Sequence, residues 1–171
     1  VEMLKGALAE WQVGNPERLA VDAGPVIDAE ARAHIEQHIQ ALQSKGRSVF
    51  RGERSDAAEL SHGDFVPPTL IELESLDELQ REVFGPVLHL LRYQRRDLGG
   101  LIEQINATGY GLTLGLHTRI DETIAQVLAG ARAGNIYVNR NRGGAGGGVQ
   151  PFGGHGLSGT GPKAGGPLYL Y

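Results

Sequence analysis

The chain of 171 residues contains no cysteine. This absence excludes, within this chain, a disulfide framework, a cysteine zinc site and a cysteine nucleophile. Long apolar runs are also missing, which excludes a predicted transmembrane helix. Hydrophobic residues make up 40% and charged residues 21% of the sequence. These proportions are typical of a folded globular protein and exclude wholesale disorder.

Acidic residues are missing from the last part of the chain. The formal net charge is −4, which disfavours general binding to nucleic acid. No Asp or Glu follows Glu122, whereas Arg132, Arg140, Arg142 and Lys163 do. This local excess of positive charge suits a small anionic ligand, although loops near a core can also simply lack acidic residues.

Glycine is concentrated in the same part of the chain. Nearly half of the 26 glycines lie between residues 143 and 166. A flexible linker is one interpretation, but Val149 and Phe152 are apolar anchors of a kind that linkers rarely carry. Because glycine allows positive φ angles and a close backbone approach, we favour a structured, ligand-facing loop over residues 142–166.

Both ends of the chain resemble the interior of a longer protein. Apolar residues recur at helical spacing from Val1 onward, with no residue before them that would cap a helix. The segment from Leu168 to Tyr171 has the pattern of the first residues of a strand. We therefore expect residues 1–171 to form a single partial domain of a truncated protein.

Helical and extended patterns alternate along the chain. Asp28 is a candidate N-cap for a helix that ends at Gly46. Residues 65–73 form an extended segment interrupted by Pro67-Pro68, which predicts an irregular or edge strand. Further predicted elements are a strand at 47–51, a helical turn at 76–83, strands at 87–93, 112–117 and 135–139, and helices that begin at the candidate caps Asp97 and Asp121.

The order of strand, helix, strand, helix and strand in the middle of the chain predicts right-handed parallel crossovers. The expected fold class is α/β, with an open, mostly parallel sheet and helices on both faces. Ligands of such sheets bind at the carboxyl ends of the strands. The glycine-rich segment follows directly on the strand predicted at 135–139, so it lies where a site is expected.

Two histidines, His34 and His38, lie one helical turn apart, a spacing that can bind a metal ion. The sequence around them, His-Ile-Glu-Gln-His, differs from the zinc-protease motif His-Glu-x-x-His, and no third ligand is evident. We therefore interpret them as part of a solvated helix face and predict no metal site.

Several motifs resemble, in the right order, those of the NAD(P)-dependent aldehyde dehydrogenase superfamily. The most specific is Glu82-Val83-Phe84-Gly85-Pro86-Val87, which resembles the Glu-x-Phe-Gly-Pro-Val signature. Residues 134–139 (Gly-Asn-Ile-Tyr-Val-Asn) and 151–154 (Pro-Phe-Gly-Gly) resemble two further signatures. The resemblance covers essentially the whole chain, and it implies the distal part of an aldehyde dehydrogenase catalytic domain.

The resemblance is narrower towards the C-terminus. Residues 138–141, 148–154 and 157–166 resemble the L-glutamate γ-semialdehyde dehydrogenase module of bacterial proline utilisation A proteins. The Gly-Pro-Lys-Ala-Gly-Gly run at 161–166 favours this branch over ordinary aldehyde dehydrogenases. The activity that the resemblance implies is the oxidation of L-glutamate γ-semialdehyde to L-glutamate in proline catabolism, with NAD as cofactor.

The resemblance also implies roles for individual residues. Glu82 would accept hydrogen bonds from ribose hydroxyls in the nicotinamide half of NAD, and Phe84 would pack against the nicotinamide ring. Backbone amides of Gly144 and Ala145 would hold the substrate carboxylate, and Phe152 would line its aliphatic stem. This anchor loop departs from the family pattern, because extra glycines replace apolar residues and raise its conformational entropy.

The catalytic residues of the family lie outside this chain. The nucleophilic cysteine and the base glutamate belong upstream, so the resemblance predicts that the isolated chain is inactive. The partners it implies are a small aldehyde that carries a carboxylate, the rest of the parent chain, and further copies in a homo-oligomer. FAD is expected only in a separate proline dehydrogenase module, and the expected location is the cytoplasm.

Two alternative functions stay open. The absent cysteine and the altered loop also fit a degenerate, non-catalytic aldehyde-dehydrogenase-like module that binds NAD or mediates dimerisation. A purely structural fragment is the other alternative, since unpaired strand edges at its ends would recruit another copy.

Overall fold

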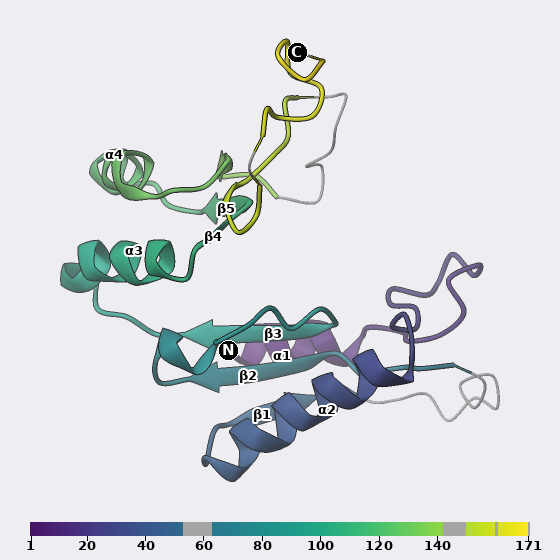
Figure 1. Cartoon of the computed structure of the whole chain (residues 1–171). Helices are drawn as coiled ribbons and strands as arrows, with labels where there is room; N and C mark the ends of the chain where they lie inside the picture. Colours follow the sequence, from purple (N-terminus) through teal and green to yellow (C-terminus); the bar gives the residue numbers. More distant parts are fainter. Residues whose placement is uncertain (53–62, 142–149, 160, 171) are drawn as a thin grey trace. The chain divides into compact units, whose positions relative to one another are not determined.

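The structure is a computed structural model that describes residues 1–52, 63–141, 150–159 and 161–170. It divides into two compact units, Val1–Arg92 and Tyr93–Tyr171 (Figure 1). Each unit has its own strands and its own hydrophobic core. That the whole chain is one partial domain stays a prediction.

The first unit combines helices with a three-stranded sheet. Its elements are α1 (Glu2–Ala9), α2 (Ala29–Ser44), β1 (Val49–Arg51), β2 (Thr69–Leu73), the 3-10 helix η2 (Leu76–Glu78) and β3 (Val87–Leu91). β1 pairs with β2 in antiparallel fashion and β2 pairs with β3 in parallel, so β2 is the central strand. Figure 1 shows α2 in front of this sheet and α1 behind it.

Of the two alternatives predicted for residues 65–73, an irregular or an edge strand, the edge strand is wrong: residues 65–68 are irregular and residues 69–73 form the central strand β2. Pro67 and Pro68 precede β2 instead of interrupting it, so the amides of the strand remain available for pairing on both sides. The Pro68 carbonyl accepts a hydrogen bond from the Gly52 amide at 2.8 Å, and the Thr69 amide donates to the Pro86 carbonyl at 2.9 Å. The two prolines therefore lead the chain into the centre of the sheet.

The boundaries of α2 agree with the prediction. The Asp28 side chain accepts a hydrogen bond from the Ala31 amide at 2.8 Å, which satisfies an amide of the first turn. Gly46 follows the helix with a φ of +81°, a left-handed conformation that favours glycine. The apolar stripe of α2 packs on the sheet in a core made of Ile35, Ile39, Leu42, Val66, Ile71 and Leu73.

The second unit contains shorter strands and its own helices. Its elements are the 3-10 helix η3 (Arg95–Asp97), α3 (Leu98–Ala107), β4 (Tyr110–Gly111), β5 (Thr113–Leu116), α4 (Asp121–Gly130), β6 (Asn135–Val138) and β7 (His155–Gly156). β5 pairs with β6 in parallel, and β4 pairs with β7 in antiparallel fashion. Leu98, Ile102 and Val127 form the core between α3, α4 and β5.

Two details of the second unit differ from the prediction. Ile120 occupies the N-cap of α4, whereas Asp121 lies in the first turn, where the positive end of the helix dipole stabilises a carboxylate. Residues 168–170 form a turn instead of starting a strand, and residue 171 lies outside the described residues. Asp97 does occupy the N-cap of α3, although its side chain makes no capping hydrogen bond.

The α/β class is confirmed, since helices alternate with the parallel pairs β2–β3 and β5–β6. The strands of the described residues form three small sheets instead of one open sheet. The reason is that β3 pairs with β2 in the first unit, whereas β5 pairs with β6 in the second.

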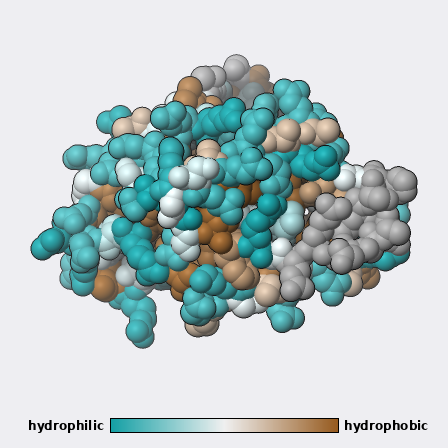
Figure 2. Space-filling model, turned by 90° about the horizontal axis from the view of Figure 1, so that it is seen from below, coloured by the Kyte–Doolittle hydropathy of each residue, from teal (hydrophilic) through white to brown (hydrophobic). Residues whose placement is uncertain are grey.

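Several large apolar side chains remain exposed on the first unit, with hydrophobic surface showing between hydrophilic residues in Figure 2. The most exposed of these side chains belong to Met3, Leu19, Ile27 and Phe84. In the described part of the chain, no helix combines the length and the apolar character needed to cross a membrane.

Candidate functional site

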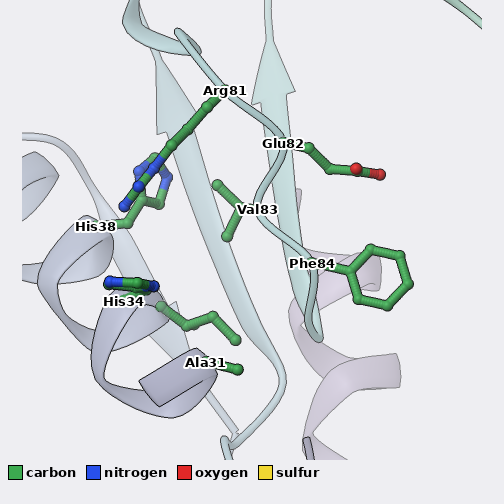
Figure 3. A pocket seen from close by; sticks show the side chains of 8 residues that line it. Ala31, His34, His38, Arg81, Glu82, Val83 and Phe84 are labelled. Carbon is green, nitrogen blue, oxygen red and sulfur yellow. The ribbon is translucent and has the colours of Figure 1, made fainter. Parts of the chain in front are cut away.

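The segment between η2 and β3 carries the first two predicted site residues. Val83 is half-buried and packs against the core beneath α2, so it anchors this segment to the first unit. Glu82 and Phe84, on either side of it, are exposed. Figure 3 shows these two side chains pointing the same way, away from α2, whereas Val83 points towards the helix.

Phe84 is unusual among the aromatic residues because 82% of its surface is exposed. Its backbone is nevertheless well held: the Gly85 amide donates to the Val83 carbonyl at 3.0 Å, and the Val87 amide donates to the Gly85 carbonyl at 2.8 Å. The ring therefore projects from an ordered turn. Glu82 has no ion-pair or hydrogen-bond partner within the described residues, so its carboxylate is free to accept hydrogen bonds from a ligand.

Two cavities meet at this segment. The larger, of about 640 Å³, is mostly apolar and is lined by residues 23–27, Ala31 and residues 83–86. The smaller, of about 180 Å³, is lined by Glu82, Phe84 and polar residues of α2 (Figure 3). Phe84 lines both cavities, whereas Glu82 lines only the smaller one.

A histidine pair lies behind this segment. The Nε2 atoms of His38 on α2 and His89 on β3 are 2.8 Å apart, and the two rings meet edge to face. Burial, followed by the effect of the neighbouring His38, lowers the pKa of His89 to about 4. Burial, followed by the positive charges of Arg81 and Lys45, lowers the pKa of His38 as well. Both imidazole rings are therefore neutral at neutral pH, so one Nε2 atom donates the hydrogen bond and the other accepts it.

Sequence reasoning missed this pair. The interpretation of a solvated helix face holds for His34, which is exposed, but is wrong for His38, which is half-buried against β3. Nothing in the spacing of the sequence connects position 38 with position 89, whose side chains meet only after β3 has paired with β2. The described residues contain no group of three or more His, Cys, Asp or Glu side chains arranged to hold a metal ion.

Phe152 lies in the second unit and is half-buried. Its amide donates to the Ala164 carbonyl at 2.9 Å, and its carbonyl accepts from the Ala164 amide at 2.8 Å. The glycine-rich segment is thus ordered on both sides of Phe152 in its described part. Gly144 and Ala145, the other predicted substrate-binding residues, lie outside the described residues.

The structure brings Glu82 and Phe84 together on one edge of the first unit, while Phe152 belongs to the second. Glu82 and Phe84 could hold a cofactor that combines a flat ring with a sugar, and Phe152 offers an apolar surface to a small substrate. Those assignments stay predictions.

Comparison with known proteins gives the family. The sequence model of the aldehyde dehydrogenase family matches residues 1–170. The chain is 68% identical to the bifunctional protein PutA of Klebsiella aerogenes, over 99% of this chain and 13% of that protein. It is also 39% identical to the 1-pyrroline-5-carboxylate dehydrogenase of Bacillus subtilis, over 92% of this chain and 30% of the relative.

A solved structure agrees with these relatives. The chain superimposes on proline utilisation A (PutA) of Bradyrhizobium japonicum with a TM-score of 0.90 at 48% identity, over 99% of this chain and 17% of that one. The chain thus spans a small part of the proteins that it matches. It belongs to the aldehyde dehydrogenase family.

Proposed function

Because the chain belongs to the aldehyde dehydrogenase family, we propose that it is the distal part of an NAD-dependent dehydrogenase that oxidises L-glutamate γ-semialdehyde to L-glutamate in proline catabolism. The likeness to PutA and to 1-pyrroline-5-carboxylate dehydrogenase supports this substrate. The observation in the structure that carries the proposal is Phe84, an ordered ring left 82% exposed close in sequence to the exposed carboxylate of Glu82. The proposal includes a cytoplasmic, homo-oligomeric parent enzyme.

The cofactor half of the proposal concerns Glu82 and Phe84. Leaving a phenylalanine exposed forgoes about 1.5–3 kcal/mol of burial free energy, so an ordered, exposed Phe84 is best explained by a partner that covers it. A nicotinamide ring stacked on Phe84 would be such a partner, and Glu82 would accept hydrogen bonds from two hydroxyls of the attached ribose. Bound NAD would supply the hydride acceptor, while these two side chains hold its ring in a fixed orientation.

The substrate half concerns the glycine-rich segment. Phe152 would line the aliphatic stem of the aldehyde, and backbone amides of Gly144 and Ala145 would hold its carboxylate. No acidic residue follows Glu122 in the sequence, so a substrate carboxylate would meet no fixed negative charge on this stretch of chain.

The parent protein must contribute the chemical step. This chain has no cysteine, so the thiolate that attacks the aldehyde must come from elsewhere in the parent, as must the base that activates water. We accordingly propose that the isolated chain does not oxidise the aldehyde.

The test uses the full-length protein that contains this chain and follows NADH formation from L-glutamate γ-semialdehyde. Glu82→Gln should raise the KM for NAD roughly tenfold or more, because it removes charge-assisted hydrogen bonds of about 1.5–3 kcal/mol. Phe84→Ala should lower kcat, because the ring that orients the hydride acceptor is gone. The isolated 171-residue chain should form no NADH.

Glu103→Gln is the matched control, since Glu103 is an exposed carboxylate on α3 in the second unit. It should leave both constants unchanged. An intact protein that does not reduce NAD with this aldehyde would refute the function. Equal effects of Glu82→Gln and Glu103→Gln would refute the cofactor role of Glu82.

A further inference from the structure

One face of β6 binds the segment that carries Phe152. Side chains alternate along a strand, so Asn135 and Tyr137 project to the same side. The Tyr137 hydroxyl accepts a hydrogen bond from the Gln150 side chain. The Asn135 side chain donates to the Pro151 carbonyl at 3.0 Å and accepts from the Gly153 amide at 3.3 Å.

The two hydrogen bonds of Asn135 flank Phe152 on either side. In extended backbone, the carbonyl before a residue and the amide after it point to one edge, while the residue's own amide and carbonyl point to the other. Ala164 occupies that second edge: the Phe152 amide donates to the Ala164 carbonyl at 2.9 Å, and the Ala164 amide donates to the Phe152 carbonyl at 2.8 Å. The Asn135 side chain therefore completes the first edge, in the place where a neighbouring strand would pair.

The chemistry of asparagine fits this place. A primary amide offers both a donor and an acceptor, whereas aspartate lacks the donor and alanine lacks both. The segment also lies close against the start of β6: a Cβ atom on Gly134 would fall 1.7 Å from the Gly153 carbonyl oxygen. Both backbone edges of Phe152 are therefore bonded, which fixes the direction in which its side chain leaves the backbone.

We propose that Asn135 is a positioning residue, which sets the orientation of Phe152 and through it the fit of the aldehyde stem. This inference rests on the proposed function, since it takes Phe152 as the substrate-lining side chain. Asn135 itself need not touch the substrate. Its effect is expected on substrate affinity and on discrimination between aldehydes of different length, more than on turnover.

The same unit provides a matched control. The Asn106 side chain donates to the Gly130 carbonyl and accepts from the Arg132 amide, both at 2.8 Å. It thus flanks Ala131 in the same manner as Asn135 flanks Phe152. Asn106→Ala removes equivalent hydrogen bonds, but at a position that does not hold Phe152.

The experiment compares Asn135→Ala, Asn135→Asp, Asn106→Ala and Phe152→Ala in the full-length enzyme. Asn135→Ala should raise the KM for L-glutamate γ-semialdehyde about tenfold with kcat within about twofold, and Asn135→Asp, which keeps the acceptor, should give a smaller increase. Asn106→Ala should lower thermal stability comparably but leave KM within about twofold. In a Phe152→Ala background, Asn135→Ala should add no further increase, because its effect acts through the ring.

A second measurement does not depend on the reaction. With 4-fluorophenylalanine at position 152, the fluorine resonance should be a single line in the wild type and in Asn106→Ala, and should broaden or split in Asn135→Ala. An unchanged resonance in Asn135→Ala would overturn the proposal even if the enzyme acts on another aldehyde. The proposal would also be overturned if the KM increases of Asn135→Ala and Phe152→Ala multiplied in the double variant. An unchanged KM in Phe152→Ala would instead refute the substrate role of Phe152, and the fluorine signal would then decide the positioning role alone.

Discussion

Gly134→Ala should strongly destabilise the second unit, and the reason is steric. Gly134 has no positive φ, so its backbone conformation accepts alanine. A Cβ atom there would nevertheless lie 1.7 Å from the Gly153 carbonyl oxygen and 2.9 Å from the Gly154 Cα. Ordinary contacts begin at 3.4 Å, and the obstructing atoms belong to backbone, which cannot rotate away as a side chain can.

The size of the effect follows from what must move. Restoring ordinary contact requires a backbone shift of about 1.7 Å, which is enough to break bonds of 2.8 to 3.0 Å. The hydrogen bonds at risk join Asn135 to Pro151 and Phe152 to Ala164 in both directions. At about 0.5–1.5 kcal/mol each, their loss amounts to about 3 kcal/mol. For a chain of this length, that lowers Tm by about 6–12 °C.

Equilibrium urea unfolding of the chain, followed by circular dichroism, measures this change. Gly100→Ala is the control, because Gly100 lies in α3 and a Cβ atom added there would have no neighbouring atom within 4 Å. It should stabilise by about 0.5–1 kcal/mol, since alanine restricts the unfolded chain and favours helix. A decrease of less than about 0.5 kcal/mol in the free energy of unfolding for Gly134→Ala would refute the steric argument. Equal effects of Gly134→Ala and Gly100→Ala would refute it as well.

Two further predictions concern titration in the first unit. The pKa of His89 is lowered to about 4 by burial and by His38, so the unfolded chain takes up a proton that the folded pair resists. The free energy of unfolding should therefore fall by about 1–2 kcal/mol, after allowance for solvent screening, as the pH drops from about 6.5 towards 4. His89→Gln should flatten this dependence of stability on pH in melting curves recorded across that range. An equally steep dependence in the variant would contradict the assignment to His89. The Arg47 hydrogen bond holds the pKa of Glu78 at about 2. The stability that Glu78 contributes should therefore be present above about pH 4.5 and be lost towards pH 2; Glu78→Gln should remove that dependence in acid titrations, and a retained dependence would exclude Glu78 as its source.

Local features of the fold could be predicted from the sequence, because their causes are local. Asp28 and Gly46 bound α2 through a capping side chain and a left-handed glycine, both of which depend on a few neighbouring residues. The same kind of reasoning failed at Asp121, which is the first residue of the helix, while its neighbour Ile120 occupies the N-cap. It also failed for β2, since a sheet order depends on which strands meet and not on the prolines beside one strand.

Motifs in the sequence led to the proposed site residues Glu82, Phe84 and Phe152, whose roles stay predictions. No periodicity connects Asn135 with the backbone on either side of Phe152. The contact of His38 with His89 is equally non-local. Both depend on segments that approach only after the strands between them have paired, so a single sequence carries no signal for them.

The motif over residues 82–87 has a physical interpretation in the structure. Val83 packs into the core, and a Cβ atom on Gly85 would lie 2.5 Å from Ile35 Cδ1, so glycine lets the turn approach α2 closely. The Pro86 carbonyl accepts from the Thr69 amide and joins the turn to β2. Val83, Gly85 and Pro86 thus hold the segment against the first unit, while the side chains of Glu82 and Phe84 point away from α2 (Figure 3). The signature therefore specifies the outward direction of two side chains as much as their chemistry, which explains why an apolar ring stays exposed on an otherwise ordered surface.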